Sequence, residues 1–137
     1  MEIILTLEPT LEKLEDSRRE IKESLAKLVG DQPWSYEFML AIEEAIVNVI
    51  DHGFNQDNPP SPIILSFECF EDKLLVTMID KGSPFDLTQT KEMNLAQHFD
   101  SYKNRGLGIY LIKNITDRIN YSFSVEEGNK LIMEKKI

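Results

Sequence analysis

Apolar side chains at helical spacing between residues 35 and 51 constrain the fold more than any other feature of the sequence. They recur every three or four positions, so all of them lie on one side of a helix. These apolar positions are Phe38, Ile42, Ala45, Ile46 and Val49. A helix with one apolar side needs a second layer of structure to cover it. The segment 52–62, "HGFNQDNPPSP", is rich in glycine, asparagine and proline, and it therefore ends the helix.

Strand-like segments elsewhere in the chain supply the second layer. Residues 62–70 and 73–80 are rich in β-branched and aromatic residues, and their short connection predicts an antiparallel pair. The expected elements, in chain order, are a strand at 2–7, a helix that Thr10 caps and Gly30 ends, a helix at 35–51, strands at 62–70 and 73–80, a helix at 105–117, and a closing hairpin at 118–137 that turns at Glu127, Gly128 and Asn129. This order favours an α+β fold, a two-layer α/β sandwich in which helices cover one face of a mixed, mostly antiparallel sheet, in a single domain over 1–137.

The charge of the chain excludes two classes of partner. It carries 24 acidic and 15 basic residues, which gives a formal net charge of −9. This charge repels the phosphates of nucleic acids and anionic membrane surfaces, so we expect neither as a partner. No apolar run approaches the ~20 residues of a membrane-spanning helix, and the N-terminus lacks the features of a signal peptide. We therefore expect a cytoplasmic protein.

Three polar residues recur at four-residue intervals along the helix at 35–51 and just beyond it. Glu44, Asn48 and His52 are offset by only ~40° from one to the next, so they form one narrow stripe. One interpretation is the solvent-facing edge of an amphipathic helix. The other is a functional site, because a carboxylate and an amide oxygen one turn apart suit a hard cation such as Mg²⁺ and a proton transfer. Glu43 lies ~100° away from the stripe, and we assign it no chemistry.

The segment "DKGSPFD", residues 80–86, follows a predicted strand and holds a second set of candidates. Glycine, serine and proline in succession are typical of an ordinary turn that ends a strand. Alternatively, Asp80 accepts a hydrogen bond from an exocyclic amine, and Gly82 lets a flat ring approach the backbone.

The segment "NRGLGIYLIKN", residues 104–114, holds the third set at the start of a predicted helix. Gly106 and Gly108 either serve helix packing or leave N–H groups free for phosphate at the helix N-terminus. Arg105 beside them would favour the second interpretation.

Taken in order, these three segments resemble the N, G1 and G2 boxes of the GHKL, or Bergerat-fold, ATPase superfamily. The patterns that carry the resemblance are Glu44-x-x-x-Asn48-x-x-x-His52, Asp80-x-Gly82-x-x-Phe85-Asp86 and Arg105-Gly106-x-Gly108. Each box alone is weak evidence, whereas the ordered trio is specific, and the resemblance covers nearly the whole chain. In its compact length, the chain most resembles the anti-sigma-factor serine/threonine-protein kinase branch of the superfamily.

The resemblance implies a role for each matching residue of the first two boxes. Glu44 would be the general base, and Asn48 would bind Mg²⁺. Asp80 would bind the adenine amino group of ATP, while Gly82 makes room for the ring. His52 would be a structural member of its box.

The third box and the segment before it are implied to contact the phosphates. Gly106 and Gly108 would bind them under a lid formed by residues 87–104, with Arg105 at the hinge of the lid. The sequence departs from the family at one point, since many relatives have a hydroxyl residue after the glycine of the final hairpin, where Asn129 stands here. Either the Asn129 amide replaces that hydroxyl in supporting the adenine site, or Thr77 or Thr116 does.

The function implied by the resemblance is that of a kinase that transfers the γ-phosphate of ATP to a serine or threonine of a small anti-sigma-factor antagonist. A sigma factor is implied as a second partner, and a homodimer as the assembly. The alternative is a nucleotide-dependent binding module without phosphotransfer, because the bound partner decides whether Glu44 reaches a hydroxyl. The ATP-binding half of a sensor histidine kinase is less favoured, since the two histidines, His52 and His98, lie within a box and within the expected lid.

Overall fold

The computed structural model describes residues 1–89 and 105–137. Its elements, in chain order, are β1 (Glu2–Leu7), η1 (Leu11–Lys13), α1 (Leu14–Val29), α2 (Ser35–His52), β2 (Ile63–Cys69), β3 (Lys73–Asp80), η2 (Leu87–Gln89), α4 (Arg105–Ile115), β4 (Arg118–Ser124) and β5 (Gly128–Lys136). The elements expected from the sequence are confirmed apart from short differences at their ends. Thr10 caps the first helical turn as expected, since its Oγ1 accepts from Lys13 N. The expected lid at 87–104 falls, from residue 90 on, outside the described residues.

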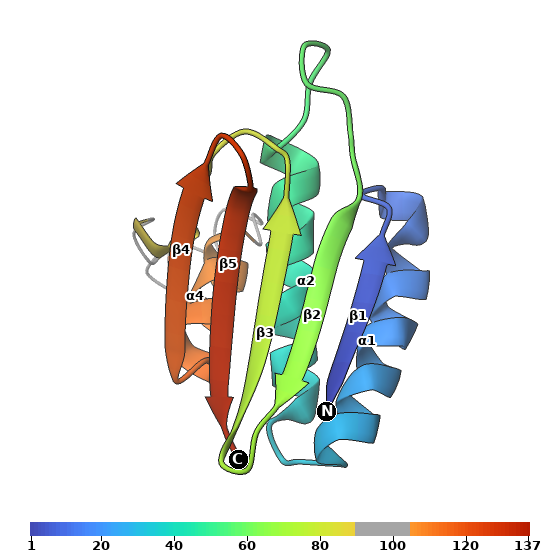
Figure 1. Ribbon diagram of the computed structural model, residues 1–137, viewed down its shortest axis with the longest axis vertical. Coiled ribbons are helices and arrows are strands. Elements are labelled where there is room, and N and C mark those ends of the chain that lie inside the picture. The colour runs from blue at the N-terminus through green and yellow to red at the C-terminus, as the bar shows by residue number, and fades with distance from the viewer. Residues whose placement is uncertain (90–104) are drawn as a thin grey trace.

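The five strands form one sheet in the order β1-β2-β3-β5-β4, and every neighbouring pair of described strands is antiparallel (Figure 1). The expectation of a mixed sheet is wrong in this respect. The reason lies in the connections, because β4 runs in the same direction as β3 but β5 lies between them. The predicted two-layer α+β sandwich is confirmed.

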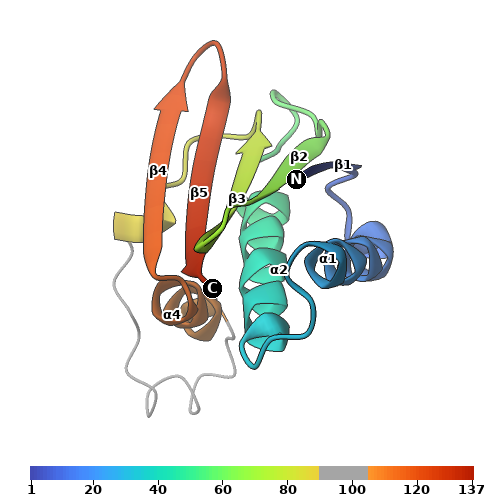
Figure 2. The same cartoon turned by 60° about the horizontal axis from the view of Figure 1, so that its bottom comes forward.

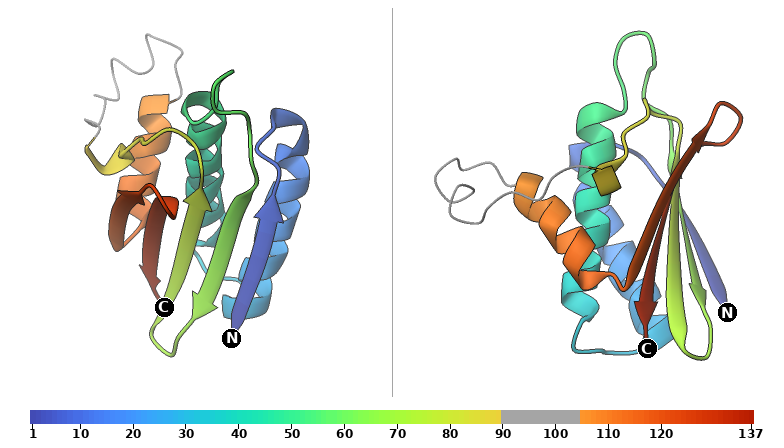
Figure 3. Two further views of the ribbon diagram at one scale, coloured as in Figure 1. Left: turned by 45° about the horizontal axis from the view of Figure 1, so that its top comes forward. Right: turned by 90° about the vertical axis from the view of Figure 1, so that its left-hand side faces the viewer.

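The helices α1, α2 and α4 lie side by side on one face of the sheet (Figure 2), and the edge-on view in Figure 3 shows the two layers. The core lies between them. Its α2 contribution is the apolar side predicted from the sequence, with Phe38, Ile42, Ala45 and Ile46 all buried. Within the described part of the chain, no helix is both long enough and apolar enough to cross a membrane.

The alternation of side chains along β3 brings a carboxylate into the core layer. Leu74, Val76 and Met78 face the helices and are buried, and the same two-residue period places Asp80 on that side at the end of the strand. Asn129 lies directly opposite Asp80 on β5. The two polar side chains therefore meet on the helix side of the sheet, beside α2.

The closing hairpin turns two residues earlier than the sequence suggests. Residues 125–127 form the turn, while Gly128 and Asn129 already belong to β5. The backbone of Gly128 has φ 84°, and a Cβ there would lie 2.3 Å from the Asp80 carbonyl oxygen. The glycine is therefore required for the close approach of β5 to β3 as well as for the bend of the chain.

Candidate functional site

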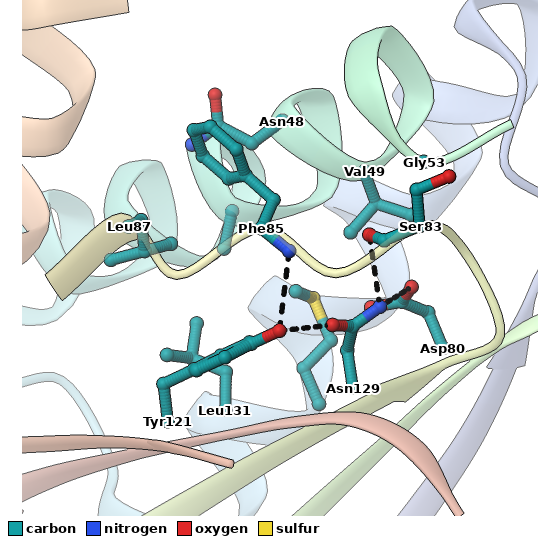
Figure 4. Close-up of a pocket in the computed structure, with 12 residues that line it drawn as sticks. Asn48, Val49, Gly53, Asp80, Ser83, Phe85, Leu87, Tyr121, Asn129 and Leu131 are labelled. Atoms are coloured by element: carbon teal, nitrogen blue, oxygen red, sulfur yellow. Dashed lines mark hydrogen bonds between the residues drawn. The ribbon is translucent and has the colours of Figure 1, made fainter. Parts of the chain in front are cut away.

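A pocket opens between α2 and the ends of β3 and β5, and Figure 4 shows its lining. It encloses about 360 Å³ of space between protein atoms, part of which is open to solvent. Its lining residues are Ala45, Asn48, Val49, Gly53, Met78, Asp80, Ser83, Phe85, Leu87, Tyr121, Asn129 and Leu131. Apolar walls with a few convergent polar groups are typical of small-molecule sites.

Asp80 supplies the carboxylate of the pocket, and its side chain is only 4% exposed. Its Oδ1 accepts two hydrogen bonds, from the Gly82 N–H at 2.8 Å and from Asn129 Nδ2 at 2.9 Å. Among the residues that the structure describes, no donor reaches Oδ2. Burial raises the pKa of Asp80, and the two N–H donors act against that rise. The carboxylate therefore keeps one oxygen available to a donor in the pocket.

Of the three residues considered in place of the expected hydroxyl, Asn129 is the one that hydrogen-bonds Asp80, and its support of an adenine site stays a prediction. Its Nδ2 also donates to the Gly82 carbonyl at 2.9 Å. Thr116 lies just after α4, where its hydroxyl donates to the Ile112 carbonyl, and it does not line the pocket. Thr77 pairs with Ile132 of β5. Successive residues of β3 point to opposite faces of the sheet, so Thr77 lies on the face away from the helices, whereas Met78 and Asp80 lie on the helix side.

Tyr121 joins the site from β4, where no sequence motif pointed to it. Its hydroxyl donates to Asn129 Oδ1 and accepts from the Phe85 N–H at 3.2 Å (Figure 4). Tyr121 lies on a strand that follows the three boxes in sequence. The strand order β3-β5-β4 is what brings it to the pocket. Burial raises the pKa of this hydroxyl, which therefore stays protonated at neutral pH.

Gly82 contacts the end of α2. A Cβ at position 82 would lie 2.7 Å from the Gly53 Cα and 2.9 Å from Asp80 Oδ1. The Ser83 N–H donates to the Gly53 carbonyl at 2.7 Å, so the loop after β3 is fastened to the loop after α2. A side chain at position 82 would therefore point at Gly53. The expectation that Gly82 makes room for a flat ring stays a prediction.

Asn48 lines the pocket from α2 and is 5% exposed. Its Nδ2 is buried and has no hydrogen-bond partner among the described residues. A buried amide without a partner is rare in folded proteins, because an unmade hydrogen bond of this kind costs about 1–3 kcal/mol. An acceptor for this amide group would come from a ligand of the pocket or from residues outside the described part of the chain, and the role of Asn48 as a Mg²⁺ ligand stays a prediction.

Glu44 lies one turn before Asn48, where α2 meets α4. A Cβ on Gly108 would lie 2.4 Å from Glu44 Oε2 and 2.8 Å from its Cδ. Glycine at 108 thus lets the first turns of α4 approach the Glu44 carboxylate. Arg105 and Gly106 begin α4 in its first turn, and their roles as phosphate contacts stay predictions.

Two neighbours of these residues have structural partners. The His52 ring stacks on Phe85, with ring centroids 4.8 Å apart. Glu43 accepts two hydrogen bonds from the Arg18 guanidinium, at 2.6 and 2.7 Å, and so joins α2 to α1 on the side away from the pocket. This pair agrees with the expectation that Glu43 lies off the polar stripe.

Comparisons with known proteins bear on the family and the fold of the chain. The family model described as a histidine kinase-like ATPase domain matches residues 7–135. The serine-protein kinase RsbW of Staphylococcus aureus, from strains JH9 and Newman, is 30% identical over 102 residues, which cover 72% of this chain and 63% of the relative. The match thus spans less than two thirds of the relative's length.

A solved structure shows the same fold. The crystal structure of the RsbU and RsbW domains of a Mycobacterium tuberculosis protein superimposes with a TM-score of 0.67 at 15% identity. The superposition covers 98% of this chain and 32% of the other.

Proposed function

Because the chain belongs to the family of histidine kinase-like ATPase domains, we propose that its pocket binds ATP with Mg²⁺ and that it transfers the γ-phosphoryl group to a serine or threonine of a small partner protein. The observation that carries the proposal is a pair of buried groups with unused capacity on two walls of one pocket. These are Asp80 Oδ2 on β3, which can accept a hydrogen bond from the base, and Asn48 Nδ2 on α2, which can donate one to a phosphate oxygen. The likeness to RsbW, which is named a serine-protein kinase, supports the transfer reaction.

Asp80 selects the base in this proposal. An ionised carboxylate is only an acceptor, so Oδ2 fits the exocyclic amine of adenine. Guanine presents a carbonyl oxygen at the corresponding position, and two acceptors would repel each other. The apolar side chains that line the same pocket, Val49, Met78 and Leu131 among them, would cover the faces of the ring.

Asn48 would hold Mg²⁺ through its amide oxygen. The fit is chemical, because Mg²⁺ takes oxygen ligands and commonly only one or two of them from protein. Bound there, Mg²⁺ supplies neutralisation of the phosphate charge. The N-terminus of α4, with Arg105, Gly106 and Gly108, would donate backbone N–H groups to the phosphates.

Glu44 would act as the general base. Its carboxylate would accept the proton of the serine or threonine hydroxyl as that oxygen attacks the γ-phosphorus and the bond to the β-γ bridging oxygen breaks. The contact with Gly108 places the carboxylate beside the helix end that is proposed to hold the phosphates.

The proposed partners follow from the same likeness. We assign the phosphorylated protein to the class of anti-sigma-factor antagonists, propose a sigma factor as a second partner, and propose that the chain works as a cytoplasmic homodimer. A nucleotide-dependent binding module without phosphotransfer remains the second candidate, since the pocket geometry serves both.

Two substitutions on α2 distinguish a loss of phosphotransfer from a loss of Mg·ATP binding. The assay measures transfer of radiolabelled γ-phosphate from ATP to the partner that copurifies with the chain, and calorimetry measures Mg·ATP binding. Glu44→Gln should keep binding and slow transfer by roughly 10²- to 10⁴-fold, the usual worth of a general base. Asn48→Ala should weaken Mg·ATP binding itself.

The matched control is Glu43→Gln, the same chemical change one residue earlier on a side chain that binds Arg18. It should leave transfer within a few-fold of the unchanged chain. Transfer at the original rate by Glu44→Gln would refute the assigned base. An unchanged chain that binds ATP and partner but never labels the partner would favour the binding module.

A further inference from the structure

We propose that Tyr121 is a positioning residue for base recognition, which acts through Asn129 to hold the Asp80 carboxylate toward a ligand with an exocyclic amine. The inference rests on the proposed ATP binding and adds to it a residue outside the three boxes. Tyr121 lies on β4 and is one of the residues that line the pocket.

The direction of the hydrogen bonds is fixed from one end of the network. The Phe85 backbone N–H can only donate, and it donates to the Tyr121 hydroxyl at 3.2 Å. The hydroxyl proton is therefore directed to Asn129 Oδ1. With its oxygen held by Tyr121, Asn129 turns its Nδ2 toward Asp80.

The other end of the network decides which Asp80 oxygen faces the ligand. Asn129 Nδ2 and the Gly82 N–H both bind Oδ1, at 2.9 and 2.8 Å. Two donors on one oxygen restrict the rotation of the carboxylate and leave Oδ2 without a donor among the described residues, on a side chain that lines the pocket. Nδ2 also binds the Gly82 carbonyl, so the amide holds both the carboxylate and the loop that follows it.

The pair Tyr121–Asn129 therefore clamps residues 82–85 at both ends. Asn129 holds the loop at Gly82, and Tyr121 holds it at the Phe85 N–H. A hydroxyl at position 129 has one proton to donate, whereas the Asn129 amide donates to both Asp80 and Gly82 and accepts from Tyr121. In this chain the Asn129 amide on β5 and the Tyr121 phenol on β4 together take the place of the hydroxyl that many relatives have after the hairpin glycine.

A double-mutant cycle tests whether Tyr121 acts through Asn129. The proteins are the unchanged chain, Tyr121→Phe, Asn129→Thr and the double variant. The ligands are Mg·ATP and the Mg complex of purine riboside triphosphate, which lacks the 6-amino group. Tyr121→Phe should weaken Mg·ATP binding by roughly fivefold, the worth of one neutral hydrogen bond, and should reduce the preference for ATP over the purine analogue.

In the Asn129→Thr background no amide is present to be held, so Tyr121→Phe should change Mg·ATP binding by less than about twofold. A purely structural role for Tyr121, through packing or through Phe85 alone, predicts the same loss in both backgrounds and no change in base preference. Urea unfolding of all four proteins separates changes in stability from changes in affinity.

Asn129→Asp gives a second test that does not depend on the tyrosine variant. It removes the donor to Asp80 Oδ1 while keeping the shape of the side chain, so it should weaken Mg·ATP binding more than Asn129→Thr, which keeps a hydroxyl donor. Equal losses from Tyr121→Phe in both backgrounds, or full Mg·ATP binding by Asn129→Asp, would overturn the inference. Failure of the unchanged chain to bind Mg·ATP would overturn the proposed function, and this inference with it.

Discussion

Asp80 holds a carboxylate at a position that disfavours charge. Burial raises its pKa, and the N–H donors of Gly82 and Asn129 offset only part of that rise. The folded chain therefore binds this proton more tightly than the unfolded chain does. The stability contributed by Asp80 is fully present below the unfolded pKa, about 3.9, and is lost as the pH rises through the higher pKa of the folded state.

We therefore expect Asp80→Asn to raise the free energy of unfolding at pH 7, and the gain over the unchanged chain to shrink as the pH falls toward about 4. The new amide keeps an oxygen for the two donors that bind Oδ1. Urea unfolding across this pH range measures the difference. Asp57→Asn is the control, because that side chain is exposed in a loop. A less stable Asp80→Asn protein at pH 7 would contradict the burial argument.

Gly108→Ala is the second change at the residue scale. Its Cβ would overlap Glu44 Oε2, the end of a flexible side chain, so the carboxylate is expected to move while the fold is kept. Transfer to the partner should fall by roughly 10²-fold, the cost of misplacing a reacting group by about 1 Å. Adding Glu44→Asp, which is shorter, should cost less in this background than in the unchanged chain. Additive losses would show that residues 44 and 108 do not interact.

Among the elements, those with a clear period were predictable. The apolar side of α2 and the strand pair β2–β3 follow from spacing alone. The resemblance assigned Glu44, Asn48 and Asp80 to one site, and of these Asn48 and Asp80 line the pocket. Local patterns could not show that Gly128 belongs to β5. A glycine in a turn and a glycine where one strand approaches its neighbour closely look alike in sequence. Tyr121 was missed for a related reason, because its partners come from β5 and from the loop after β3.

Two explanations for the glycine at position 82, packing against α2 and space for a ligand ring, predict different effects of a substitution there. The structure sets it against Gly53, which fastens the loop after β3 to the end of α2. Gly82→Ala should therefore lower the free energy of unfolding by about 1–3 kcal/mol, the usual cost of overpacking against backbone. Urea unfolding measures this. Unchanged stability together with weaker Mg·ATP binding would instead support the role expected from sequence, the approach of a flat ring.

At the scale of the whole molecule, the sheet order assembles the site. Residues of α2, β3, β4 and β5 line one pocket because β5 lies between β3 and β4 while α2 runs behind β3 (Figure 1). The formal charge of −9 opposes a triphosphate, so recognition must come from the local groups at the pocket. A ligand that binds only the folded chain raises its stability, by about 2.7 kcal/mol at a hundred times the dissociation constant.

The central claim is that this pocket binds adenine nucleotide through Asp80. Calorimetric titration of the unchanged chain and of Asp80→Asn with Mg·ATP and Mg·GTP tests it most directly. We expect the unchanged chain to bind Mg·ATP and to discriminate against Mg·GTP, and Asp80→Asn to lose roughly ten- to a hundredfold in Mg·ATP affinity, the worth of a hydrogen bond to a charged group. Equal binding of the two nucleotides, or unchanged Mg·ATP affinity in Asp80→Asn, would contradict the claim.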